Sequence, residues 1–154
     1  MAVATQEVFY HTDALVETWD LGAATPALTL VKQAGSARYG VSLTNTAGIA
    51  TERTKTLGPY EISAPTFAGV GNDEADAIGT YAAGVAVDGT WEFADIVSSG
   101  TTPVPTSTAQ GTVVYVTSAG ELTLESAGND RIGVVNYPAT YPKAAGTLPV
   151  QIGA

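Results

Sequence analysis

Glycine and proline recur every few residues along this chain, and their spacing limits its possible folds more than any other feature. The 154 residues include 17 glycines and 8 prolines. Both residue types interrupt helices, whereas threonine and valine, which dominate the stretches between them, suit pleated strands. We therefore predict a mostly β chain of one-domain size with little helix. A short helix over 72–78, capped by Asn72 and ended by Gly79, is the open alternative to a loop there.

Two apolar runs in the first half, 27–31 and 38–43, flank the glycine-containing segment 32–37. This pattern predicts a hairpin with a six-residue connection. A third strand over 50–57 is expected to extend the hairpin before a Gly-Pro pair breaks the chain.

The clearest turn signal of the second half is Asp88-Gly89, between the apolar stretches 82–87 and 90–94. Asp-Gly supplies the positive φ angles of a two-residue hairpin turn, so the two stretches are predicted to pair. Alternation then places large apolar residues on shared faces, Val85 with Val87 and Trp91 with Phe93.

Segment 98–108 lacks periodicity and is expected to be an exposed linker or long loop. The stretches 112–117 and 121–125 flank a glycine-containing turn and predict a second hairpin. Alternation along 121–125 predicts Leu122 and Leu124 inward and Glu121, Thr123 and Glu125 outward.

Two further strands are predicted over 132–135 and 148–152. Because Pro149 has no backbone N–H, the last strand is expected at a sheet edge, or with this residue where an N–H needs no partner. So many short strands predict a small β-barrel or β-sandwich, β-tulip-like, with short hairpins. A single domain over 27–154 would comprise a first sheet region, 27–79, and the small barrel, 80–154.

Residues 1–26 are a candidate extended N-terminal arm. They carry four acidic residues and no basic one, and their large side chains follow no sustained strand or helix period. An arm that lies along a partner is one interpretation, and an ordinary edge strand with loops is the other.

Charge is scarce and unevenly distributed. The net charge is −9, and 56–130 contains ten carboxylates without a single Lys or Arg. The six basic residues form no stripe, so we expect no binding to nucleic acid, which requires clustered cations. No apolar run approaches the roughly 18 residues of a membrane span, and no signal peptide is recognisable. We therefore expect a chain made in a cytoplasm, without a membrane partner.

The residue types that carry most protein chemistry are rare. The absence of cysteine excludes disulfides, thiolate chemistry and cysteine-based metal sites. The single histidine, His11, lies in the candidate arm without a Gly-x-Ser-x-Gly motif, which disfavours a Ser-His-Asp hydrolase. Glu92, Glu121 and Glu125 fall on predicted solvent faces, which disfavours a glycosidase with paired acids. We predict no enzyme activity and no cofactor.

The best candidate for metal binding is a cluster of oxygen ligands at Asp73, Glu74 and Asp76. Calcium prefers such ligands, but their spacing differs from that of an EF-hand loop. A helix cap or a solvated loop is the competing interpretation, so weak calcium binding stays open and no metal site is predicted.

Four short stretches of the C-terminal third share a recognisable pattern. They are Gly111-Thr-Val-Val-Tyr-Val, Gly120-Glu-Leu-Thr-Leu, Arg131-Ile-Gly-Val-Val-Asn-Tyr-Pro138 and Gly146-Thr-Leu-Pro-Val-Gln-Ile-Gly153. This pattern resembles that of the tailed-bacteriophage capsid decoration proteins, or head cement proteins. The resemblance covers residues 80–153 well and residues 1–79 loosely.

The resemblance implies a β-rich structural protein of the virion, assembled as a homotrimer on the outer surface of an expanded capsid. Such a protein would bind the major capsid protein at junctions between coat subunits and stabilise the shell, often with an extended N-terminal segment on the shell. No catalytic residue comes with the resemblance.

Aromatic residues dominate interface hot spots, so Phe9, Tyr10 and Trp19 are the predicted partner-binding residues. Packing onto the chain's own barrel is the alternative for all three. Two other functions stay open. One is a glycan-binding module of a phage tail or fibre, with contacts through exposed Tyr60, Trp91 or Tyr141, and the other is a glycan hydrolase.

Overall fold

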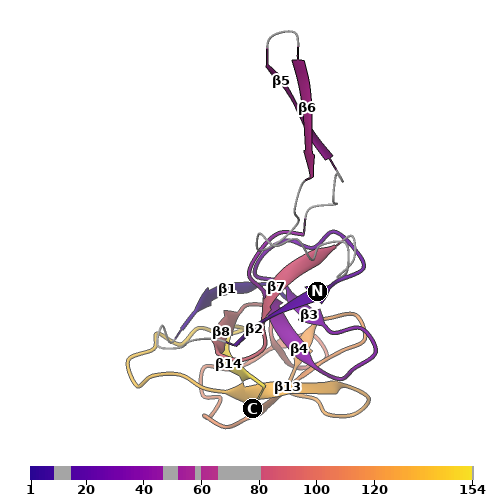
Figure 1. The fold of residues 1–154 in the computed structure, drawn as a ribbon. Helices are drawn as coiled ribbons and strands as arrows, with labels where there is room; N and C mark the ends of the chain where they lie inside the picture. The colour runs from indigo at the N-terminus through magenta and orange to yellow at the C-terminus, as the bar shows by residue number, and fades with distance from the viewer. Residues whose placement is uncertain (9–14, 47–51, 58–59, 66–80, 154) are drawn as a thin grey trace.

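The computed structural model describes residues 1–8, 15–46, 52–57, 60–65 and 81–153. These residues form strands and turns and no helix, which confirms the mostly β fold class. Figure 1 shows two curved sheets packed together, as in a small barrel or sandwich, and a two-stranded ribbon that projects from them. The segment 72–78, predicted as a possible helix, lies outside the described residues.

The larger sheet has eight strands. In order across the sheet they are β1 (Ala4–Glu7), β8 (Thr90–Phe93), β14 (Leu148–Ile152), β13 (Asp130–Val135), β11 (Val113–Val116), β12 (Leu122–Thr123), β9 (Val97–Ser99) and β10 (Thr102–Pro103). Neighbouring strands are antiparallel except for β12 and β9, which are parallel.

The smaller sheet has four antiparallel strands. Their order is β2 (Val16–Asp20), β7 (Ala82–Ala86), β4 (Tyr39–Ser42) and β3 (Leu30–Lys32). The projecting ribbon consists of β5 (Glu52–Leu57) and β6 (Tyr60–Pro65), which pair with each other.

Residues 2–7 join the two sheets along a seam. On one side β1 pairs with β8. On the other side the Ala4 N–H donates to the Leu28 carbonyl (2.7 Å) and the Leu30 N–H donates to the Ala2 carbonyl (2.9 Å). β1 and β2 come last in the strand order of their sheets, and residues 2–4 also pair with 28–30 across the seam. Residues 9–14 lie outside the described residues, so the N-terminal arm over 1–26 stays a prediction.

The main core lies between the sheets, and a smaller cluster lies on the other face of the four-stranded sheet. Successive strand residues point to opposite faces: Ala86 packs in the main core with Phe93 and Val150, whereas Val85 packs in the smaller cluster with Trp19. The alternation predicted for Val85 with Val87, and for Trp91 with Phe93, is confirmed because each pair shares a cluster.

Other local predictions are also confirmed. β3 pairs with β4 as the first predicted hairpin, and β11 pairs with β12 as the second. The strands predicted over 132–135 and 148–152 are β13 and β14.

The hairpin predicted at Asp88-Gly89 is wrong. β7 and β8 belong to different sheets, so this pair of residues turns the chain from one sheet into the other. Backbone N–H groups of two other segments hold the corner: Leu15 N–H donates to Asp88 Oδ1 (3.0 Å), and Ile152 N–H donates to the Gly89 carbonyl (3.0 Å). The positive φ of Gly89, 96°, serves this corner.

The prediction that the last strand lies at a sheet edge is wrong. The other expectation, that Pro149 occupies a position where an N–H needs no partner, is confirmed. β14 lies between β8 and β13 in the middle of the sheet. Backbone N and O of one strand residue point toward the same neighbouring strand, and the Pro149 carbonyl accepts from Asn136 N–H (3.0 Å), just past the end of β13. The N–H that Pro149 lacks would therefore point toward Asn136, beyond the last paired residues of β13 and β14.

Three further expectations are corrected. The strand predicted over 50–57 pairs with β6 instead of extending the β3–β4 hairpin. Segment 98–108 contains β10 and the fully buried Val104, so it is not a free linker. Thr123 is 2% exposed rather than outward, because β12 is covered on both faces.

Candidate functional site

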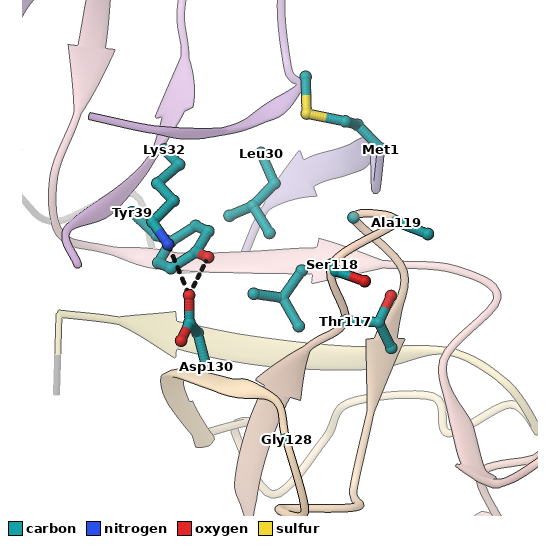
Figure 2. A pocket seen from close by; sticks show the side chains of 11 residues that line it. Met1, Leu30, Lys32, Tyr39, Thr117, Ser118, Ala119, Gly128 and Asp130 are labelled. Atoms are coloured by element: carbon teal, nitrogen blue, oxygen red, sulfur yellow. Dashed lines mark hydrogen bonds and ion pairs between the residues drawn. The ribbon is translucent and has the colours of Figure 1, made fainter. Parts of the chain in front are cut away.

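A pocket of about 490 Å³ opens between the two sheets beside the start of the chain (Figure 2). β3 and β4 contribute Leu30, Lys32 and Tyr39, and β13 contributes Asp130. The turn between β11 and β12 forms the opposite wall, and Met1 covers one end. The pocket thus combines an apolar floor with a charged rim.

Three polar side chains meet at this rim. Lys32 Nζ and Tyr39 Oη both donate to Asp130 Oδ2 at 2.7 Å, and the Lys32 ammonium lies 5.3 Å from the centre of the Tyr39 ring. The cluster links β3 and β4 of the smaller sheet to β13 of the larger one. These hydrogen bonds connect the two sheets through residues that are far apart in sequence.

The rim cluster has fixed protonation states near neutral pH. The hydrogen bonds from Lys32 and Tyr39 lower the pKa of Asp130, and the hydrogen bond to Asp130 raises the pKa of Lys32. Burial, followed by the hydrogen bond to Asp130, raises the pKa of Tyr39. A general acid or base works best with a pKa near the operating pH, and these three shifts all lead away from it.

Glu92 is the centre of a second polar network, on the outside of the larger sheet. Its carboxylate accepts from Thr5 Oγ1 (2.5 Å), from Tyr141 Oη (2.5 Å) and from Gln6 Nε2 (3.2 Å). Burial acts to raise the pKa of Glu92, but the three hydrogen bonds outweigh it and lower the pKa. Burial, and then the hydrogen bond to Glu92, raise the pKa of Tyr141 far above its usual range.

This network corrects the prediction that Glu92 simply faces solvent. Its carboxylate fastens both β1 and the loop after β13 onto β8, and is therefore part of the seam. Glu121 and Glu125 are exposed as predicted.

Of the three predicted partner-binding residues, only Trp19 lies within the described chain. Trp19 is 4% exposed and packs with Val31 and Val85. Its Nε1 donates to Glu17 Oε2 (2.9 Å), and the Arg38 guanidinium lies 5.9 Å from the ring centre. Trp19 therefore packs onto the chain's own sheet, and its predicted role in binding a partner stays a prediction. Phe9 and Tyr10 lie outside the described residues.

Two of the three aromatic residues proposed for glycan contact, Trp91 and Tyr141, are covered by the chain itself. Trp91 is 4% exposed in the main core, and its Nε1 donates to the Asp88 carbonyl. Tyr141 is half-buried and bound to Glu92. Tyr60 begins β6, in the projecting ribbon.

The residues considered for metal or hydrolytic chemistry, Asp73, Glu74, Asp76 and His11, lie outside the described residues. Within the described ranges, no group of three His, Cys, Asp or Glu side chains is arranged to hold a metal ion. The same ranges contain no helix that is long and apolar enough to cross a membrane.

Sequence reasoning missed the apolar residues that the fold leaves exposed. The large ones among the described residues are Met1, Val3, Leu15, Val16 and Leu43, with 38% to 67% of their surface exposed. The exposure of Val3 could have been predicted from the alternation along residues 2–7, because its neighbours Ala2 and Ala4 pack inward. The seam thus presents apolar surface next to the pocket.

Comparisons with protein-family models, with curated proteins and with solved structures find no match to this chain.

Proposed function

We propose that this chain is a structural protein of a tailed-bacteriophage virion, which decorates the outer capsid surface and binds the major capsid protein at junctions between coat subunits. The proposal includes self-association as a homotrimer, and it includes no catalytic activity and no binding to nucleic acid or membrane.

One observation carries the proposal. The stretches that resemble capsid decoration proteins correspond to consecutive neighbours in one sheet: β12, β11, β13 and β14. The four stretches are therefore neighbours in space as well as in the sequence pattern, and this adjacency supports the proposal. A compact β body with an exposed apolar seam also suits a protein that works by burying surface, because many copies on one shell need only modest affinity each.

The test is binding to capsids of the phage that encodes the chain, assembled without it. Expanded capsids should take up the protein to a fixed number of copies, visible in sedimentation and in cryo-electron microscopy, and should then resist heat or osmotic shock better than bare shells. Unexpanded capsids serve as the matched control. A chain that sediments apart from both forms of the capsid would refute the proposal.

A further inference from the structure

The apolar pattern of β11 and β13 differs from that of β8 and β14 in the same sheet. β11 reads Val-Val-Tyr-Val, and β13 ends in Ile-Gly-Val-Val. β8 and β14 instead carry Glu92 and Gln151 between apolar residues. An antiparallel strand covered on one face alternates between apolar and polar residues, whereas an unbroken apolar run is typical of a strand covered on both faces. The sequence of β11 and β13 therefore indicates a cover on each side.

The chain itself covers the inner face of these strands fully and the outer face partly. Val114 and Val116 lie in the main core, with 0% and 3% of their surface exposed. Because successive residues point to opposite faces, Val113 and Tyr115 point outward, and both are only half-buried. Val134 pairs with Val113 across the strands, shares its face and is also half-buried. We call Val113, Tyr115 and Val134 the outer strip.

The outer face of the neighbouring strands β8 and β14 has a cover of its own. Residues of the loop after β13 bind there: Tyr141 Oη donates to Glu92 Oε2 (2.5 Å), and Asn136 Nδ2 donates to Gln151 Oε1 (3.3 Å). Pro149, which points outward in β14, is fully buried. The same loop leaves the outer strip partly exposed. Figure 1 shows β13 on the side of the body away from the β5–β6 ribbon, where another molecule can approach it.

We propose that another copy of this chain covers the outer strip in solution, and that this contact builds the homotrimer of the proposed function. The inference rests on that function and names the surface through which the copies meet. Interfaces of permanent homo-oligomers are more apolar than the rest of the protein surface, whereas reversible interfaces are not. Two valines and a tyrosine therefore fit a second copy better than a coat protein that is bound after assembly.

The charges around the outer strip also favour self-association. The chain has a net charge of −9, so contacts that bring carboxylates of two copies together cost free energy. Asp130, the acid of β13, points to the other side and binds Lys32 and Tyr39. The charged residue on the strip's own side is Arg131, the cross-strand partner of Tyr115. Copies can therefore meet at the outer strip without bringing acids of these strands into contact.

Two lysines in the outer strip test the contact. Val113→Lys combined with Val134→Lys should weaken self-association at least about tenfold in analytical ultracentrifugation. The variant should then be monomeric at concentrations where the wild-type chain has three times its mass of 15.6 kDa. Val113→Ile with Val134→Ile keeps the apolar surface and the strand preference, and should associate like wild type.

Val3→Lys is the matched control for a charge at an exposed valine. Val3 is 53% exposed, more than either valine of the outer strip, but it lies on the seam, so this variant should associate like wild type. Circular dichroism checks that the lysine variants are folded. Tyr115→Thr, which adds no charge and keeps a strand-forming residue, is a second variant of the outer strip and should weaken association several-fold.

Two results would overturn the inference: folded lysine and Tyr115→Thr variants that associate as strongly as wild type, or a wild-type chain that is monomeric in solution at all concentrations. A lysine variant that stays trimeric but no longer binds expanded capsids would also overturn it, because the outer strip would then meet the coat protein. Capsid binding by a chain that fails the association test would leave the decoration function standing, so the inference and the proposed function can fail separately.

Discussion

A close backbone approach at Gly133 in the larger sheet gives the sharpest prediction about stability. Gly133 lies in β13 opposite Ile152 of β14, and a Cβ atom added at Gly133 would lie 1.9 Å from the Gln151 carbonyl oxygen. Real Cβ atoms essentially never come closer than 3.0 Å to such an atom. Gly133→Ala therefore forces β13 and β14 apart by about 1 Å in an interior that packs as densely as a crystal.

The cost follows from two contributions. Overpacking of this kind costs about 1 to 3 kcal/mol, and weakening roughly two ladder hydrogen bonds costs about 1 kcal/mol each. The sum, about 3 to 5 kcal/mol, is a large part of the 5 to 15 kcal/mol that typically separates folded from unfolded domains. With a urea dependence of about 2 kcal/mol per molar, the midpoint should fall by roughly 2 M.

Urea unfolding followed by tryptophan fluorescence measures this cost, because Trp91 lies in the main core. Gly128→Ala is the control: Gly128 has a φ of +76° and open space around it, so a methyl group there brings backbone strain of about 1 kcal/mol without a clash. A Gly133→Ala midpoint equal to that of Gly128→Ala would refute the argument from close approach.

The rim cluster and the Glu92 network each predict a further measurement. Because Asp130 has a lowered pKa in the folded state, its stabilisation is present at neutral pH and is lost as the pH falls through the folded-state pKa; Asp130→Asn should therefore reduce the acid sensitivity of the urea midpoint, and an unchanged pH profile would contradict this. Tyr141→Phe removes one donor to Glu92, so the pKa of Glu92 in an NMR titration should rise and stability should fall by about 1 kcal/mol. Tyr115→Phe is the control, with no shift expected at Glu92. The homotrimer of the proposed function predicts a light-scattering mass of about three times 15.6 kDa, and a monomer on the shell as well as in solution would contradict it.

The sequence predicted strands, their turns and the faces of their residues, because these follow from local alternation and glycine placement. Leu122 is buried and Glu121 exposed as the pattern of 121–125 required. The choice of strand partners was predicted less well. Asp88-Gly89 has the residues of a hairpin turn, yet the chain crosses from one sheet to the other there, because β7 and β8 each pair with segments far away in sequence.

The candidate site could not be predicted from local sequence patterns, because it also depends on contacts between distant segments. Lys32, Tyr39 and Asp130 are separated by up to 98 residues, and no pattern in the sequence brings them together before the barrel closes. Pro149 shows how far a local rule reaches. The rule that proline must occupy a strand position whose N–H needs no partner was correct here, but the conclusion that β14 is an edge strand was wrong.

The seam also determines the order in which this protein can fold. β1 is synthesised before its partner β8, which lies more than eighty residues later, and β8 in turn pairs with β14, more than fifty residues further on. Loop closure over such distances is slow, and until it occurs the β8 edge remains open to strands of other chains. Synthesis of many copies at once would thus favour aggregation unless the nascent chains are shielded until β8 has paired.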